Sequence, residues 1–244
     1  MMPPLLRVLV TLVLPGVAAA AQPSDVSTIE SHGGYSTLSV HTFRPLDAVA
    51  TALDSQFVIA VGAEDPLFQF KGDMMDISVE VPKVLAGTLV PARWGFEVRF
   101  AVNLDGSPLD TRDLLRSIVT AANSRSEFAY RLDEDRGAFS FVPTRTHDAQ
   151  GRSIAATPLL DRPVTIPRGV RKINESAWLM AQELSKQTGL QVSCCQSSVA
   201  GYPWGMEEAA FAANGEPART VLRRLGLSIW HVRCDQAFCF IEMR

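Results

Sequence analysis

The end of the chain reads Leu227-Ser-Ile-Trp-His-Val-Arg-Cys-Asp-Gln-Ala-Phe-Cys-Phe-Ile-Glu-Met243, which is two alternating runs around a short polar turn. This pattern predicts a β-hairpin. If Cys234 is paired with Cys239, the register places the apolar side chains on one side of the hairpin: Trp230, Val232, Cys234, Cys239, Ile241 and Met243. The other side is mixed: His231, Arg233, Phe240 and Glu242. One apolar and one mixed face is what a sheet that lies on a core requires.

The segments before this hairpin occur in an order that the first half of the chain also shows. In the second half we expect a strand at 164–166, a helix capped by Asn174 and ended by Gly189, strands at 190–194 and 208–213, and a helix that begins at Pro217. In the first half we expect a strand at 38–43, a helix that begins at Pro45, strands at 57–61 and 94–102, a helix capped within 107–110, and a hairpin at 128–142. The two hairpins share the similar runs Ala138-Phe-Ser-Phe-Val142 and Ala237-Phe-Cys-Phe-Ile241. The sequence therefore predicts an internal duplication.

The second half resembles a known family. The stretches Leu184-Ser-Lys-Gln-Thr-Gly-Leu-Gln-Val-Ser193 and Gly215-Glu-Pro-Ala-Arg-Thr-Val-Leu-Arg-Arg-Leu225, followed by the terminal hairpin, are similar to the secretin and TonB N-terminal short domain. The matching positions are Gly189, Leu190, Gly215 and Leu222, and the resemblance covers residues 173–243. The whole chain resembles secreted bacterial proteins of the same two-unit layout. The resemblance implies a small α/β domain that contacts other proteins in the periplasm, and no reaction.

The first 21 residues are typical of a secretory signal peptide. Arg7 precedes the apolar run Val8–Leu14, and Ala19 and Ala21 form a small-residue cleavage site before Gln22. The run is interrupted at Pro15 and is too short to span a bilayer. We therefore expect a soluble mature chain, exported to the periplasm or beyond, with no membrane span.

The composition excludes several classes of partner. The chain has 244 residues with 23 Lys and Arg against 26 Asp and Glu, a formal net charge of −3. This balance argues against nucleic-acid binding and against a basic membrane-surface protein. The expected partner is an envelope protein that contacts a sheet edge or a loop, and the oligomeric state stays open.

The four cysteines all lie late in the sequence: Cys194, Cys195, Cys234 and Cys239. Their spacing fits neither a zinc site nor a C-x-x-C motif. In an oxidising compartment a Cys234–Cys239 disulfide is favoured, with Cys194 and Cys195 free or joined to each other. Alternatively, Cys194 or Cys195 is bonded to the hairpin. Cys194 shares the inward phase of its strand, and Cys195 points the other way.

No catalytic motif is found, so we expect a protein that is not an enzyme and holds no cofactor or metal. The four histidines show no ligand spacing, and the chain has no H-E-x-x-H, G-x-S-x-G or P-loop pattern. The acidic triplet at 133–135 is interpreted as a solvated turn, and Arg219, Arg223 and Arg224 as the solvent-exposed face of the last helix. The remaining candidate is the aromatic loop 201–208, where Tyr202, Trp204 and Met206 either pack as a local core or bind a partner.

These observations predict an α+β fold of two tandem units, each a mixed sheet with two helices in the order β-α-β, β-α-β-β. The expected boundaries are a signal peptide at 1–21, a flexible leader at 22–36, a first unit at 37–143, a linker at 144–161 and a second unit at 162–244. The predicted function is a non-enzymatic interaction or scaffold module. The alternatives are a small-molecule binder in the groove between the units and a thiol or redox enzyme that uses Cys194 and Cys195.

Overall fold

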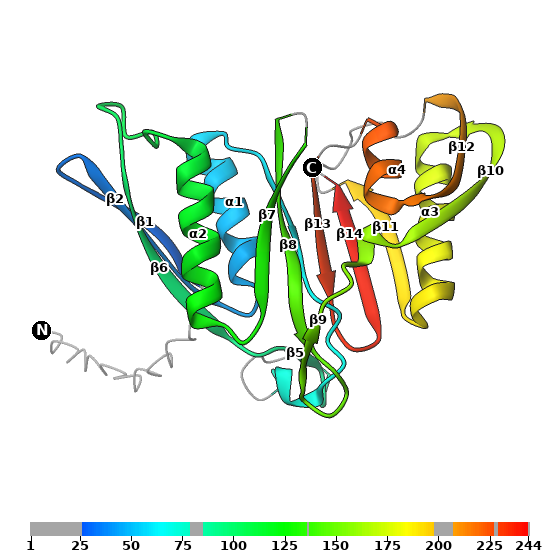
Figure 1. The fold of residues 1–244 in the computed structure, drawn as a ribbon, viewed down its shortest axis with the longest axis horizontal. Coiled ribbons are helices and arrows are strands. Elements are labelled where there is room, and N and C mark those ends of the chain that lie inside the picture. The colour runs from blue at the N-terminus through cyan, green and yellow to red at the C-terminus, as the bar shows by residue number, and fades with distance from the viewer. Residues whose placement is uncertain (1–25, 79–84, 136, 198–206, 227–228, 244) are drawn as a thin grey trace, which may run out of the picture.

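The computed structural model describes residues 26–78, 85–135, 137–197, 207–226 and 229–243, which form an α+β fold (Figure 1). The elements of the first half are β1 Val26–His32, β2 Tyr35–Thr42, α1 Pro45–Phe57, β3 Val61–Glu64, η1 Lys71–Asp73, β4 Met74–Asp76, β5 Leu89–Pro91, β6 Trp94–Ala101, α2 Thr111–Arg125, β7 Ala129–Asp135 and β8 Ala138–His147. Those that follow are β9 Ser153–Ala155, η2 Leu159–Asp161, β10 Pro163–Lys172, α3 Ile173–Thr188, β11 Gln191–Ser197, β12 Glu208–Pro217, α4 Ala218–Arg224, β13 Trp230–Cys234 and β14 Phe238–Met243.

A central sheet runs through both halves of the chain. Its strand order is β11-β14-β13-β3-β8-β7, with β9 paired to β8. The two halves meet where β13 pairs in parallel with β3, through His231 with Ala63 and Val232 with Glu64. Sequence order does not reveal this junction, because the two strands are far apart along the chain.

Each half has its own hydrophobic core on one face of the central sheet. On one face, α1 and α2 lie between that sheet and a three-stranded sheet of order β1-β2-β6. On the other face, α3 and α4 lie between it and the β10–β12 pair. Figure 1 shows the resulting succession of layers, with α1 and α2 on one side of the central strands and α3 and α4 on the other.

The N-terminal boundary of the first unit differs from the prediction. Residues 26–36 were expected in a flexible leader, but Val26–His32 form β1, which pairs with β2 in an unbroken antiparallel register. Gly33 and Gly34 connect the two strands with positive φ angles of 52° and 86°. Such angles suit a two-residue hairpin turn, so these glycines let the alternating run before them fold back.

The boundaries of β3 and α3 differ from the prediction, whereas α2 begins where it was predicted. Helix α1 continues to Phe57 and ends at Val58, which has a left-handed φ of 57°, so the next strand begins only at Val61. Helix α3 begins after Lys172, so Asn174 lies inside the helix and not at its N-cap. Helix α2 begins as expected, because the Asp110 side chain accepts a hydrogen bond from the Asp113 backbone N–H.

The similar runs in the two hairpins do not occupy equivalent core positions. Phe139 and Phe141 face the core of the first half. Their counterparts in the sequence match, Phe238 and Phe240, stack on each other with ring centroids 6.4 Å apart, on the side of β14 opposite Cys239 and Ile241. The two halves thus share the order of their elements. The residues that align in the two similar sequence runs, however, do not occupy equivalent positions in the two cores.

The segment 144–161, predicted as a linker, is built into the fold. It contains the end of β8, strand β9 and the turn η2. Leu159 and Leu160 of η2 are fully buried in the core of the second half.

Candidate functional site

The terminal hairpin has the predicted register. Strands β13 and β14 pair residue by residue from Trp230–Met243 to Cys234–Cys239. Cys234 and Cys239 form a disulfide, with a Cα–Cα distance of 4.1 Å, and both are fully buried. Cys194 is also disulfide-bonded and packs against the same core. The side chain of Cys195 and the loop residues Tyr202, Trp204 and Met206 lie outside the described residues, so the predicted loop site stays a prediction.

A buried ion-pair cluster crosses the junction between the halves. Arg219 of α4 donates to Glu64 of β3 at 2.7 Å and to Asp161 of η2 at 2.9 Å. Arg219 and Glu64 are only 4% and 3% exposed. The prediction that Arg219 lies on a solvent-exposed helix face is therefore wrong. Its helix packs against η2, and its side chain reaches the first half's strand, so the guanidinium is enclosed between the two halves.

The acidic triplet takes part in the same junction. Asp133 and Asp135 lie in β7, not in a solvated turn, and both form ion pairs with Arg223 of α4, at 3.8 and 2.7 Å. Burial raises the pKa of Glu64, while the charge of Arg219 opposes that effect. A buried carboxylate of this kind depends on its arginine partner for compensation.

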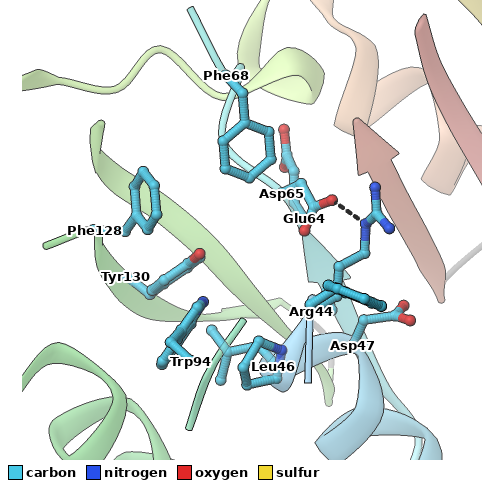
Figure 2. Close-up of a pocket in the computed structure, with 12 residues that line it drawn as sticks. Arg44, Leu46, Asp47, Glu64, Asp65, Phe68, Trp94, Phe128 and Tyr130 are labelled. Atoms are coloured by element: carbon cyan, nitrogen blue, oxygen red, sulfur yellow. Dashed lines mark hydrogen bonds and ion pairs between the residues drawn. The ribbon is translucent and has the colours of Figure 1, made fainter. Parts of the chain in front are cut away.

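The residue after β3 carries a second polar contact. Asp65 accepts hydrogen bonds from Arg44 at 2.6 Å and from the Cys234 backbone N–H at 3.0 Å. Arg44 also donates to the Cys234 carbonyl at 2.9 Å. Figure 2 shows Arg44, Asp65 and Glu64 at the wall of a cavity that Trp94 and Tyr130 also line. The cavity has a volume of about 10 Å³, which is at most the space of one water molecule, so it admits no larger ligand. The hydrogen bonds of Arg44 and Asp65 to the Cys234 backbone connect the two halves.

The mixed face of the hairpin contacts the first half through Asp47 of α1. Asp47 accepts from His231 at 2.5 Å and from Arg233 at 3.0 Å. Burial by itself would raise the pKa of Asp47, but the hydrogen bonds and charges of His231 and Arg233 outweigh it and hold the pKa at about 2.

We therefore expect Asp47 to stabilise the fold above its unfolded pKa of 3.8. This contribution, about 2 kcal/mol, should be lost as the pH falls from roughly 4 to 2, because the unfolded state takes up a proton first. The test is the free energy of unfolding of the wild type and Asp47→Asn across this range. The difference between the two proteins should shrink as the pH falls, and a difference that is constant with pH would contradict the assignment.

A second buried histidine, His147, connects β8 to the segment between β3 and β6. His147 of β8 contacts Asp73 at 2.9 Å through Nδ1 and Glu127 at 3.4 Å through Nε2. Phe70 and Phe128 pack around its ring. No group of three or more metal-ligating side chains that could hold an ion occurs in the part of the chain that the structure describes.

A groove of about 470 Å³ lies between the two halves. The first half contributes Leu67, Phe68, Gln69 and Lys71, and the second contributes Arg162, Gln187, Thr188, Leu190 and Gln236. Two cationic side chains and three amides line it, beside a small apolar wall. A ligand groove between the units was one alternative suggested by the sequence, without any lining residue.

The exposed face of α2 lies between two sheet edges of the first half. On one side a shallow groove of about 510 Å³ separates α2 from β6, which is the last strand of its sheet. We call this the edge groove, and it is lined by Glu97, Val98, Asp113, Arg116, Ser117, Thr120, Ala121 and Ser124. On the other side a groove of about 420 Å³ separates α2 from β7. Neither groove could be predicted, because the order of strands in a sheet is not visible in the sequence.

The edges differ in how much of their backbone is already used. On β7, Tyr130 donates its N–H to Asn123 Oδ1 at 2.8 Å and accepts from Asn123 Nδ2 at 2.9 Å. On β11, Val192 donates its N–H to Ser185 Oγ at 2.9 Å. Strand β10 carries Pro163 and Pro167 and two register shifts. Such features hinder the addition of a further strand.

Strand β6 has no proline and no register shift among its described residues, but its last residue, Ala101, already uses its outward carbonyl. The strand pairs with β2 through all eight residues without a register shift. The Ala101 carbonyl points away from β2, because it accepts a hydrogen bond from the Leu109 N–H. Since the direction alternates along a strand, Gly95, Glu97 and Arg99 also direct their backbone N–H and C=O groups outward, towards the edge groove.

The fold and this surface define an α+β protein with two cores on one shared sheet and an open strand edge beside a helix. In comparisons with known proteins, no family model, no curated protein and no solved structure matches the chain. Among the described residues, none of the helices combines the length and apolar character needed to cross a membrane.

Proposed function

We propose that this protein is an exported, non-enzymatic interaction module that binds an extended segment of an envelope protein at the edge of β6. The open edge beside the edge groove is the observation that carries the proposal. Strand addition gives affinity through backbone hydrogen bonds, and the neighbouring groove selects alternate side chains of the added strand.

The edge groove is lined mainly by polar side chains. Ser117, Thr120 and Ser124 present hydroxyl groups on the exposed side of α2, and Asp113 and Arg116 add one charge of each sign. The buried Cys234–Cys239 disulfide supports export, because disulfides persist in oxidising compartments.

Site-specific photo-crosslinking in cells tests this proposal. A benzoylphenylalanine at Thr120, inside the edge groove, should crosslink to one defined segment of a partner. The matched control replaces Lys186, an exposed residue of α3 whose side chain is 76% accessible, and should give no such product. Equal products at both positions, or none at Thr120, would contradict binding at the β6 edge.

The groove between the halves favours a second candidate, a small anionic ligand. Lys71 and Arg162 line it from opposite halves, and the buried Nε of Arg162 makes no hydrogen bond to the described residues. A carboxylate or phosphate could accept from both side chains. Titration with inorganic phosphate should then raise the melting temperature, and Arg162→Gln should abolish the increase.

A further inference from the structure

We propose that the segment added to β6 is the β6 strand of a second copy of this chain, so that the protein forms a two-fold symmetric dimer through a continuous six-stranded sheet. This inference rests on the proposed function and names its partner. It follows from the charges and the backbone directions along β6.

The exposed face of β6 carries two opposite charges, Glu97 and Arg99, separated by Val98. Both are held on this face by side chains of β2. Ser39 Oγ donates to Glu97 at 3.2 Å, and the Arg99 guanidinium lies 4.5 Å from the centre of the Tyr35 ring. The charges are therefore positioned before any partner arrives.

An antiparallel pairing of two β6 strands around Val98 brings these charges together. Glu97 of each copy then lies opposite Arg99 of the other, and both residues have the outward backbone groups that such a hydrogen-bonded pair needs. Opposite charges in this position stabilise a strand pair, and like charges destabilise it. The neighbouring symmetric register, centred on Glu97, would set two carboxylates opposite each other, so the charge pattern selects the register centred on Val98.

At its centre, the inner side of the same pairing is apolar. Val98 lines the edge groove from its floor and is 5% exposed. In the register centred on Val98, the two valines meet at the symmetry axis as a pair without hydrogen bonds, the closer type of antiparallel pair. The groove of about 510 Å³ provides the space beside β6 that the partner strand enters.

Charge reversal tests the pairing directly. The wild type should sediment as a dimer at high concentration and dissociate on dilution. Glu97→Arg sets two arginines opposite each other at both ends of the pairing, and Arg99→Glu does the same with two glutamates. Each single variant should weaken self-association at least about tenfold, since each reverses two cross-strand pairs.

Two combinations should restore association. The double variant E97R/R99E again places opposite charges across the interface and should dimerise like the wild type. An equimolar mixture of the two single variants should form a heterodimer, because a strand with arginine at both positions then faces a strand with glutamate at both positions. Glu97 and Arg99 are exposed, so the melting temperatures of the monomers should be unchanged.

Two results would overturn the inference: a wild type that stays monomeric, or single variants that dimerise as well as the wild type. The crosslink at Thr120 separates this failure from failure of the proposed function. A Thr120 crosslink to another protein together with a monomeric wild type would refute the dimer and leave strand addition at β6 in place. A Thr120 crosslink to β6 of a second copy supports both.

Discussion

Replacing Arg219 by Met should lower the free energy of unfolding by about 3–5 kcal/mol, because it leaves the buried Glu64 carboxylate without its counter-charge. Glu64 is 3% exposed and accepts from Arg219 at 2.7 Å; its other hydrogen bond comes from the Leu160 N–H at 3.0 Å. One backbone N–H does not compensate a buried charge. Urea denaturation of the purified protein measures the loss.

Two further variants distinguish this cause from a simple loss of packing. The double variant Glu64→Gln/Arg219→Met removes both charges and should lose less stability than the sum of the single variants. Arg224→Met is the matched control on the same helix, because Arg224 pairs with Glu216 at the surface and its side chain is 46% exposed. That change should cost no more than about 1 kcal/mol.

The pH dependence of Arg219→Met has a defined sign. Without the guanidinium, the main charge that opposes the burial-driven rise in the pKa of Glu64 is gone. The folded variant then takes up a proton at a higher pH than the unfolded chain does, so its stability deficit should shrink as the pH falls. Equal deficits in Arg219→Met and Arg224→Met, or a deficit that does not change with pH, would show that Glu64 is not the source of the loss.

The sequence predicted local structure well where alternation or helical spacing carried the information. The register of β13 and β14 followed from the apolar side that Trp230 and Val232 share with Ile241, and the disulfide followed from the register. Most of the order of helices and strands was predicted in the same way. Such patterns report which side of an element is buried, and this is fixed by neighbours close in the chain.

The junction could not be predicted because its partners are distant in sequence. Arg219 lies 155 residues after Glu64. It adjoins the apolar face of α4, and in the helical pattern a buried arginine at this position cannot be distinguished from an exposed one. One signal was present: Glu64 and Asp65 directly follow the short apolar run of β3, and charges at the end of a buried strand need partners. The edge groove left no comparable signal, because which strand ends a sheet depends on the pairing of the others.

The shared sheet also explains why charge accumulates between the cores. Each residue of β3 and β13 that faces one core has a neighbour that faces the other. Val232 packs in the core of the second half, while His231 and Arg233 reach Asp47 in the first. Since helices of both halves cover the sheet, side chains that would face water in a single unit must here find partners across the junction.

Replacing Trp230 by Ala should be as destabilising as the loss of Arg219, at about 3–5 kcal/mol, because removal of a fully buried aromatic side chain leaves a cavity. Trp230 is the largest fully buried side chain among the described residues, and Arg219 and Arg223 lie 5.6 and 5.5 Å from its ring centre. The change therefore weakens the core of the second half and the junction together.

Trp178→Ala is the matched control, since Trp178 lies on α3 with 56% of its surface exposed. Its removal should change stability by no more than about 0.5 kcal/mol. If the halves are coupled through the β13–β3 junction, Trp230→Ala should shift a single unfolding transition. In a background that also carries Trp178→Phe and Trp204→Phe, Trp94 is the one tryptophan left in this variant, so its fluorescence reports on the first half and should follow the same transition as far-UV circular dichroism. A transition that moves only in the second half would show that the shared sheet does not couple the two cores.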